Sequence, residues 1–553
     1  MSKRLLALFG TVLILSSGAY AQVVVSMDTK DGDTISGDHK FRATVRSPSL
    51  VSQVEFYVDD NLVATDDSTP YEFVMDTLIH DDTIVKVTVA AYNMDGDTKR
   101  LEIRVRINNG LALGVKHHVD LASEALTEQR WADAVISCRV ALKIDPEDNA
   151  ARMAMARAQF GRGAFDLAQK FAEDVVADDP GHIPARELLA GINLRQAFRA
   201  MEQGTDRDST ITTLSNALSN AARGRRDSLG EQLNDFGAVT DENRLDYVDL
   251  LIKASRYSLA INELAPVFSK DERNPAVANR LMYAMLRAGR FSEAQITWRN
   301  HTRRGDPDAY GYALKAVISN WLGDESASAD AEREALLYDP SDMGVRTSQA
   351  FLALRRGNLS TFASITRRLV SSTGFSPVTN YYLSSLYYIQ GNFSMSESAF
   401  QAGLLADPSI YDIYLERFNQ SISYFVSSNP EGQEKAYQLA FAKTFVDGAL
   451  AAKAESFEAL TALSILYMLG EKPDDALRYA QAATAAGPQY AAAQYTLAGA
   501  YFLARRPQDG VDAMDRAGSL DSYLNGRKVP NAQEAWRYFY TRGRMPLLAP
   551  PSG

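Results

Sequence analysis

The sequence predicts a protein of two parts, an all-β sandwich followed by an all-α solenoid of stacked helix pairs. Three observations predict this fold class. Stretches within residues 22–109 alternate apolar and polar side chains with a period of two, which is typical of half-buried strands. From about residue 110 the pattern becomes helical and rich in Ala and Leu. In that region prolines return at intervals such as 34 residues (Pro146 to Pro180), and a fixed period of this size indicates structural repeats.

The composition is that of a globular protein and excludes several kinds of site. The 553 residues are 46% apolar and 23% charged, which is too apolar for general disorder. The formal charge of −11, from 58 basic and 69 acidic side chains, argues against nucleic acid as a partner because phosphate binding needs a basic surface. The single cysteine, Cys138, excludes an internal disulfide and multi-cysteine zinc or iron–sulfur sites. We therefore expect no cofactor.

The first 21 residues have the pattern of a secretory signal peptide. A basic start at Met1–Arg4 precedes an apolar run to about Leu15, and small residues end at Ala21. The run is too short for a membrane anchor, which needs about 18 apolar residues or more. We expect cleavage after Ala21 and an extracytoplasmic location, either periplasmic or secreted to the cell surface. No later stretch is long and apolar enough to predict a transmembrane segment.

The predicted strands of residues 22–109 form a small domain. Apolar and polar side chains alternate along 41–46, 54–58 and 101–107. Asp59-Asp60-Asn61 follows one such run and indicates a hairpin turn, because Asp and Asn tolerate positive φ. About seven short strands in this length are typical of a β-sandwich.

Three sequences in this domain carry a family resemblance. They are Val54-Glu55-Phe56-Tyr57-Val58-Asp59-Asp60-Asn61-Leu62-Val63-Ala64-Thr65, Thr69-Pro70-Tyr71-Glu72-Phe73 and Val89-Ala90-Ala91-Tyr92-Asn93. Together they resemble the bacterial immunoglobulin-like domains. The resemblance implies a spacer, an adhesion unit or a docking unit rather than a catalyst. Because the antibody-type core Trp and disulfide are absent, it implies nothing immune-like.

The β domain is acidic, with 16 Asp and Glu against 9 Lys and Arg in residues 22–109, a net charge of −7. The cluster Asp28, Asp31, Asp33 and Asp38 has two interpretations. Calcium would require six to eight oxygen ligands. The glycine spacing does not match an EF-hand loop, so polar turns are the favoured interpretation.

The helical part carries a repeated mark that has a structural reason. A Gly is followed two residues on by an aromatic and then by a small residue, as in Gly163-Ala164-Phe165 leading to Ala168, and again from Gly289 and Gly391. The Gly ends one helix by accepting left-handed φ, and small residues lie where paired helices cross. The predicted crossing positions are Ala122, Ala134, Ala168, Ala294, Ala316 and Ala350.

This pattern resembles the tetratricopeptide repeat family, and the resemblance covers about three-quarters of the chain. It implies a superhelical solenoid that binds other proteins. The expected sections are 110–240 with a degenerate stretch, 241–408 with regular repeats, 409–455 with irregular long helices, 456–545 with repeats and a C-terminal capping helix, and a disordered tail at 546–553. A loop is expected at Gly224–Ser228.

The sequence contains no local signature of an active site or a metal centre. It has no H-E-x-x-H, G-x-S-x-G, Walker or G-x-G-x-x-G motif. The one adjacent histidine pair, His117-His118, is interpreted as a solvated helix start, and Cys138 as a buried core thiol. We therefore predict no catalytic, cofactor-binding or metal-binding residues.

The resemblance to the repeat family implies that the first helix of each pair faces a concave groove. Tyr and Arg on this surface would suit recognition of a protein partner, because they combine large contact area with directed hydrogen bonds. The predicted groove positions are Asn279, Arg280, Tyr283, Tyr310, Tyr381, Tyr388 and Tyr495.

The predicted function is a non-enzymatic, extracytoplasmic scaffold that binds protein partners of unknown identity through this groove, in the assembly of an envelope complex. One alternative is a cell-surface adhesion or glycan-binding protein that contacts glycans through the β domain. A second alternative is an enzyme whose site forms only in three dimensions.

Overall fold

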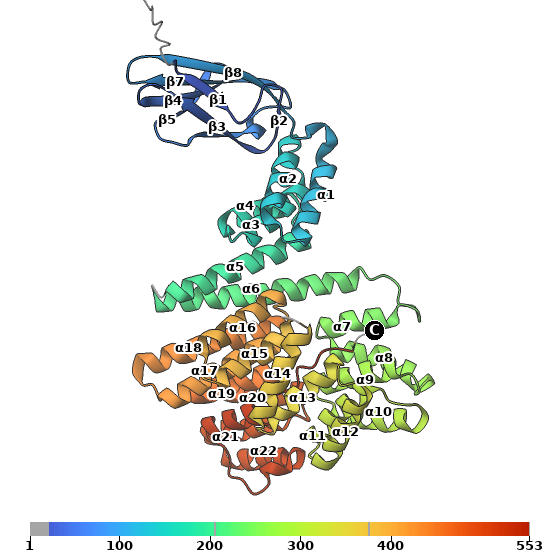
Figure 1. Cartoon of the computed structure of the whole chain (residues 1–553). Helices are drawn as coiled ribbons and strands as arrows, with labels where there is room; N and C mark the ends of the chain where they lie inside the picture. Colours follow the sequence, from blue (N-terminus) through green and yellow to red (C-terminus); the bar gives the residue numbers. More distant parts are fainter. Residues whose placement is uncertain (1–21, 204–205, 374–375, 552–553) are drawn as a thin grey trace, which may run out of the picture. The chain divides into compact units, whose positions relative to one another are not determined.

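A computed structural model describes residues 22–203, 206–373 and 376–551. The predicted signal peptide lies outside these residues. The chain divides into two compact units, residues 1–180 and 181–553. The described residues of the first are coloured from blue to blue-green in Figure 1, and those of the second from green to red. Each unit is described separately below.

The first unit begins with a β-sandwich, as predicted. One sheet has the order β1 (Val24–Met27), β3 (Asp38–Arg46), β6 (Tyr71–Asp76), and its strands are antiparallel. The other has the order β2 (Thr34–Ile35), β8 (Thr98–Ile107), β7 (Ile84–Asn93), β4 (Val51–Val58), β5 (Asn61–Asp66), in which only β2 runs parallel to its neighbour β8.

The core of the sandwich follows from the alternation along its strands. Phe41 of β3 and Phe56 of β4 are fully buried, whereas Arg42 next to Phe41 is exposed. The Phe73 ring of β6 contacts both buried rings, with centroids 6.2 and 5.8 Å away. The hairpin between β4 and β5 is also as predicted, since Asp59 and Asp60 have φ of 46° and 68°.

Two helix pairs follow the sandwich in the same unit. They are α1 (Gly114–Thr127) with α2 (Trp131–Ile144), and α3 (Asn149–Gly161) with α4 (Phe165–Asp178). The predicted crossing residues Ala122, Ala134 and Ala168 are fully buried, and Gly163 between α3 and α4 has a φ of 77°. Cys138 in α2 is fully buried, which confirms the interpretation as a core thiol.

The sandwich contacts the first helices through a polar junction. The buried Asn109 side-chain carbonyl accepts hydrogen bonds from the Gly37 amide and the Thr77 hydroxyl, each 2.9 Å long. Arg139 of α2 forms ion pairs with Asp38 at 3.1 Å and Asp76 at 2.5 Å. The connection between β8 and the first helices is therefore fixed by hydrogen bonds of Asn109 within the sandwich and by ion pairs from α2 to the sandwich.

The second unit consists of antiparallel helix pairs. Its first half contains α5 (Ile183–Gln203), α6 (Arg207–Asn234), α7 (Arg244–Lys253), α8 (Tyr257–Lys270), α9 (Pro275–Arg287), α10 (Phe291–Arg304), α11 (Ala309–Trp321), α12 (Glu325–Tyr338), α13 (Met343–Arg355) and α14 (Leu359–Thr373). The loop expected at Gly224–Ser228 is wrong, because these residues continue α6. Burial of Leu218 before them and Leu229 after them holds the helix through that stretch.

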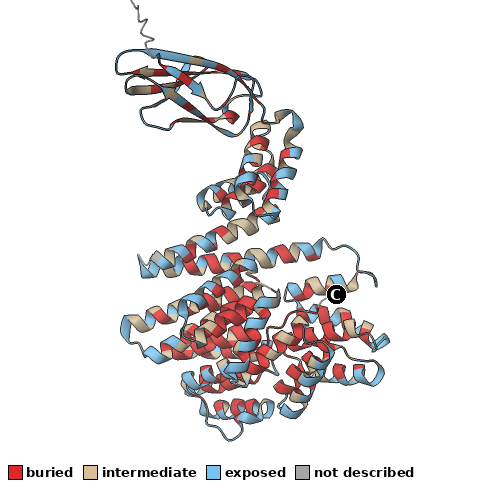
Figure 2. Cartoon of the chain, viewed as in Figure 1, coloured by how far each residue is buried: buried red, intermediate tan, exposed pale blue. Residues whose placement is uncertain are grey.

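The second half contains α15 (Pro377–Ile389), α16 (Phe393–Ala406), α17 (Tyr411–Ser428), α18 (Gly432–Ala452), α19 (Phe457–Leu469), α20 (Pro473–Ala486), α21 (Ala491–Leu503), α22 (Pro507–Leu520) and α23 (Ala532–Thr541). The first helix of each pair is the inner one. Every residue of α9 from Val277 to Arg287 is buried, whereas α10 buries only five positions. Figure 2 shows the buried residues gathered towards the middle of this unit.

The inner helices are buried because the solenoid turns back on itself. Arg287 of α9 forms an ion pair with Asp412 of α17, 125 positions later. The Trp321 ring of α11 lies 6.2 Å from that of Tyr490, which precedes α21. The inner faces of early and late repeats thus meet, and the space between them is narrow.

Candidate peptide-binding groove

The seven predicted groove residues all lie on inner helices of the second unit, but they do not line an open surface. Six of them are buried, with exposed fractions of 2% to 7%, and Tyr388 is half-buried. Their surroundings divide them into two groups.

Four of the seven contact neighbouring helices. The Asn279 side-chain amide donates to both Asp308 oxygens at 2.9 Å, and the Arg280 guanidinium donates to the two Asp249 oxygens at 2.7 and 2.8 Å. The Tyr388 hydroxyl donates to the Gln420 carbonyl at 3.0 Å, and Tyr495 contacts the Tyr538 ring of α23. These side chains connect successive repeats, in place of the open groove lining that the sequence predicts.

The other three, Tyr283, Tyr310 and Tyr381, lie against the C-terminal end of the chain. Residues 545–551, here called the tail segment, run between the inner faces of the repeats without forming a helix or strand. The disorder expected from residue 546 is wrong for the described residues, because Leu547 and Leu548 are 5% and 1% exposed. Burial of these two leucines holds the segment against the inner helices.

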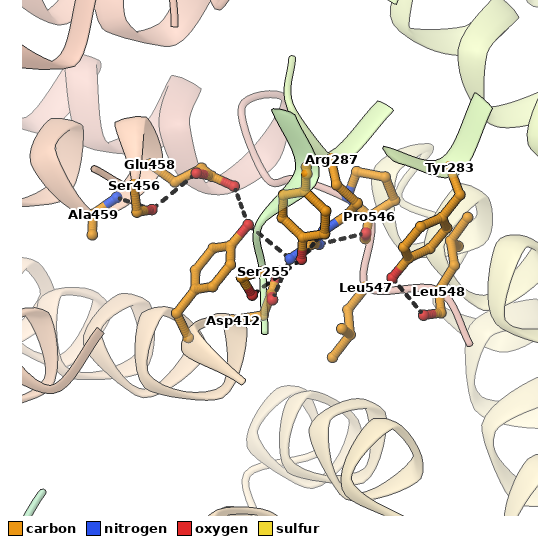
Figure 3. Close-up of polar contacts among 12 residues, drawn as sticks. Ser255, Tyr283, Arg287, Asp412, Ser456, Glu458, Ala459, Pro546, Leu547 and Leu548 are labelled. Carbon is orange, nitrogen blue, oxygen red and sulfur yellow. Dashed lines mark hydrogen bonds and ion pairs between the residues drawn. The ribbon is translucent and has the colours of Figure 1, made fainter. Parts of the chain in front are cut away.

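Four successive carbonyls of the tail segment each accept a hydrogen bond from an inner helix. The four donors, here called the inner-face donors, are Arg287 to Pro546 at 2.8 Å, Tyr382 to Leu547 at 2.8 Å, Tyr283 to Leu548 at 3.5 Å and Tyr310 to Ala549 at 2.7 Å. The Ala549 amide in turn donates to the Thr347 hydroxyl at 3.1 Å. The inner helices therefore bind the tail segment through its backbone, as Figure 3 shows around Arg287 and Tyr283.

Arg287 is the charged member of the inner-face donors, and only 1% of its side chain is exposed. It donates to both Asp412 oxygens at 2.9 and 2.6 Å and to the Tyr411 hydroxyl at 2.7 Å. Burial alone would lower the pKa of Arg287, but the Asp412 carboxylate and the hydroxyls of Tyr257 and Tyr411 raise that pKa well above its ordinary value. The guanidinium is therefore a permanent cation that has one further hydrogen bond to give to a carbonyl.

The tyrosine donors keep their protons. Burial raises the pKa of Tyr283, Tyr310 and Tyr382 well above the ordinary value of 10.0. Each hydroxyl is thus a donor at any physiological pH. An array of fixed donors of this kind can bind a peptide backbone through its carbonyls.

The Tyr310 ring reaches the tail segment because Gly344 has no side chain. A Cβ placed at residue 344 of α13 would lie 1.9 Å from Cε2 of Tyr310. Glycine at position 344 therefore allows the Tyr310 ring to pack directly against the backbone of α13.

A cavity of about 370 Å³ lies beside the last residues of the tail segment. Leu547, Leu548, Pro550 and Pro551 form one side of it. The other side includes Asp249, Lys253, Tyr257, Val378 and Ile410. The first three lie in α7 and α8, Val378 lies in α15, and Ile410 directly precedes α17. The bound segment thus leaves room next to it that a longer or larger segment could fill.

Sequence reasoning missed Arg287, Thr347, Tyr382 and the tail segment. The sequence held one usable signal, the pair Leu547-Leu548 in a stretch otherwise interpreted as disordered. In a disordered tail both leucine side chains would be exposed to water, which is unfavourable in free energy, so the pair indicated burial. Arg287 lies in the last turn of α9 and had no local pattern that set it apart.

The remaining candidate positions have structural contacts. Carboxylates of Asp28 and Asp33 accept hydrogen bonds from the Thr29 and Lys30 amides, at 2.8 and 2.7 Å. The expectation of a solvated helix start is wrong for His118, which is 5% exposed and hydrogen-bonded to the Gly110 carbonyl at 2.9 Å. Among the described residues, no three His, Cys, Asp or Glu side chains are grouped to hold a metal ion.

None of the helices within residues 22–203, 206–373 and 376–551 combines the length and the apolar character that crossing a bilayer requires.

Two family models match stretches of the chain. Residues 24–96 match the family model of the bacterial Ig domain, and residues 125–192 match that of the tetratricopeptide repeat. A search of curated proteins gave no significant match. Among solved structures, the APC/C hetero-tetramer Cut9–Hcn1 aligns with 13% identity and a TM-score of 0.38, over 74% of this chain and 87% of that one.

Two further solved structures align. Yeast Tom70 does so with 13% identity and a TM-score of 0.33, over 77% of this chain and 94% of its own. The fibronectin(III)-like modules of Clostridium thermocellum CbhA align with 21% identity and a TM-score of 0.14, over 16% of this chain and 46% of theirs. The family models thus identify a bacterial Ig domain at residues 24–96 followed by a tetratricopeptide repeat at residues 125–192, and further helices follow this matched stretch.

Proposed function

We propose that this protein is a non-enzymatic, extracytoplasmic scaffold that binds a partner protein at the inner face of its second unit, in the assembly of an envelope complex. The observation that carries the proposal is the row of inner-face donors, which bind successive carbonyls of an extended chain. Recognition through backbone carbonyls is independent of side-chain identity, so a segment of another protein can use the same donors.

The two matched families support this role. Tetratricopeptide repeats support protein–protein interaction, and neither family indicates an enzyme. The extracytoplasmic location is supported by the signal-peptide pattern of the first 21 residues and by the bacterial Ig domain.

Photo-crosslinking from single positions in the full chain tests the proposal in intact cells. Photoreactive residues at Val378 and Ile410 would lie beside the cavity next to the tail segment. Matched controls are Ile296 on α10 and Val511 on α22, which are 51% and 42% exposed. A third control is Leu62 in the β domain, which is 54% exposed.

We expect one envelope protein to be captured at Val378 and Ile410 and not at the three controls. Capture only at Leu62 would contradict the proposal and favour adhesion through the β domain. Capture only at Ile296 or Val511 would move the interaction to the outer helices. Capture of cytoplasmic proteins alone would contradict the proposed location.

A further inference from the structure

We propose that the tail segment occupies the binding site of the partner protein. The partner segment is an extended, proline-containing apolar stretch that displaces the tail segment. This inference rests on the proposed function and deepens it by naming the chemistry of the bound segment. The tail segment has the sequence Met545-Pro546-Leu547-Leu548-Ala549-Pro550-Pro551. Its features define what the site accepts.

The first feature is the backbone. Three of the seven residues are prolines, which have no N–H and favour φ near −65°. A segment of this kind is already extended before it binds and loses little conformational freedom. The four inner-face donors need only carbonyls, which prolines retain. A partner segment rich in prolines therefore meets every requirement that the bound tail segment meets.

The second feature is the apolar pair. Leu547 and Leu548 are 5% and 1% exposed, and Met545 is 4% exposed. A charged residue at either leucine position would lose most of its contact with water, which is unfavourable. The site therefore favours segments with large apolar residues at two adjacent positions over acidic or basic ones.

The third feature is that two of the inner-face donors, Arg287 and Tyr382, keep hydrogen-bond partners when the tail segment leaves. Arg287 keeps its ion pair with Asp412 and its hydrogen bond to Tyr411. The Tyr382 hydroxyl also lies 3.1 Å from the Thr347 carbonyl, to which it can donate instead. Two of the four inner-face donors thus have partners within the repeats, which lowers the free-energy cost of opening.

A partner segment must compete with a tethered one. Only residues 542–544 separate the tail segment from α23, and a short tether gives an effective concentration on the order of millimolar. A free peptide of the same sequence would compete only near that concentration. A protein segment that also fills the cavity of about 370 Å³ beside Pro550 and Pro551 would gain contacts that the tail segment does not make. The extra contacts would allow displacement at lower concentration.

Thiol labelling of the full chain tests this proposal without removing the tail segment. The only native cysteine, Cys138, is buried in the first unit. Labelling of the folded chain therefore reports the reactivity of the thiol introduced in the second unit. One variant carries Ala549→Cys in the tail segment. The matched control carries Ser385→Cys in α15, where the side chain is 1% exposed. A peptide of residues 544–551 and a second peptide with both leucines replaced by Asp are the probes.

We expect the thiol at residue 549 to react about tenfold faster or more than that at residue 385, because the tail segment opens without unfolding of the repeats. Millimolar peptide should raise the rate at residue 549 several-fold, and the Asp-containing peptide should not. Equal rates at residues 549 and 385 would overturn the proposal, since the tail segment would then open only with the fold. Fast labelling that the peptide does not change would also overturn it.

Light scattering on the same samples separates the partner segment from a second copy of the chain. A monomer at all concentrations is expected. A dimer whose formation protects residue 549 would overturn the proposal in favour of exchanged tail segments. Failure of photo-crosslinking at Val378 and Ile410 would instead contradict the proposed function while leaving the peptide result unchanged, so the two failures are distinguishable.

Discussion

Arg287 of α9 and Asp412 of α17 form a doubly hydrogen-bonded ion pair with 1% and 7% of their side chains exposed, although 125 positions separate them in the sequence. The pair closes the turn of the second unit and directs one further Arg287 N–H to the Pro546 carbonyl. Closure of the repeats and binding of the tail segment therefore depend on the same guanidinium.

Removal of one member of this pair should destabilise the second unit strongly. Asp412→Leu leaves the Arg287 cation buried without its carboxylate, at a cost of about 3–5 kcal/mol. The double variant Arg287→Met, Asp412→Leu removes both charges and should recover most of the loss. Urea unfolding followed by circular dichroism measures both. A loss below about 1 kcal/mol for the single variant would contradict this account of closure.

Gly344→Ala should displace Tyr310, because the added Cβ would lie 1.9 Å from the ring. We expect a loss of about 1–3 kcal/mol from overpacking, together with faster opening of the tail segment. Gly224→Ala is the matched control, because it lies within α6 with no atom within 4 Å of an added Cβ. The control should gain up to about 1 kcal/mol. Similar effects of the two substitutions on unfolding would show that Tyr310 moves freely.

Tyr310→Phe should release the Ala549 carbonyl while keeping the ring in place. The lost hydrogen bond of 2.7 Å would weaken the tail segment by about 0.5–1.5 kcal/mol. The thiol of Ala549→Cys would then be labelled roughly two- to tenfold faster, by the relation of 1.4 kcal/mol to a tenfold change. Tyr338→Phe serves as a control, because this tyrosine is 57% exposed on the outer helix α12. An unchanged labelling rate for Tyr310→Phe would argue against backbone recognition by this hydroxyl.

Cys138 should be inert in the folded chain. Burial raises the pKa of its thiol from 9.0 to about 12, so almost no thiolate forms below pH 10. Between these two values the folded chain holds the proton and the unfolded chain loses it. The contribution of Cys138 to the free energy of unfolding therefore falls as pH rises from about 9 to about 12. Rapid reaction with a disulfide reagent at pH 8 without denaturant would contradict the buried position.

Asn109→Ala should loosen the junction between the β domain and α1. Its side-chain carbonyl accepts from the Gly37 amide and the Thr77 hydroxyl. Removal leaves the Gly37 amide unpaired at about 1–3 kcal/mol, whereas the Thr77 hydroxyl can still donate to the Gly37 carbonyl at 2.8 Å. The control Asn108→Ala changes an exposed neighbour and should cost less than about 1 kcal/mol. Thermal unfolding of the full chain compares the two. Equal melting temperatures would show that the junction does not depend on Asn109.

Local patterns predicted most of the fold. Alternation placed Phe41 and Phe56 in the sandwich core, and the repeat period placed Ala316 and Ala350 at buried helix crossings. Such features depend on neighbours within a few residues or one repeat. The hairpin at Asp59-Asp60 and the buried thiol of Cys138 were predicted for the same reason.

The candidate site was predicted only in part because its contacts join distant residues. Tyr283 and Tyr310 were expected on the inner face, but their acceptors at Leu548 and Ala549 lie 265 and 239 positions away. Nothing local in the sequence reports how far the repeats turn, and that turn decides whether the inner face is open. The disorder expected from residue 546 was wrong because the inner helices that bury Leu547 and Leu548 lie far from them in the sequence.

The inner face of the second unit is proposed to bind an extended apolar segment through its backbone. Its most direct test is a titration of a fluorescent peptide of residues 544–551 with the full chain carrying Leu547→Asp and Leu548→Asp, which should expel the tail segment without shortening the chain. Saturable binding is expected, and it should weaken at least about tenfold when Tyr283, Tyr310 and Tyr382 are all replaced by Phe, since three hydrogen bonds are worth about 1 kcal/mol each. Absence of saturable binding, in a chain that keeps its helical circular dichroism, would contradict it.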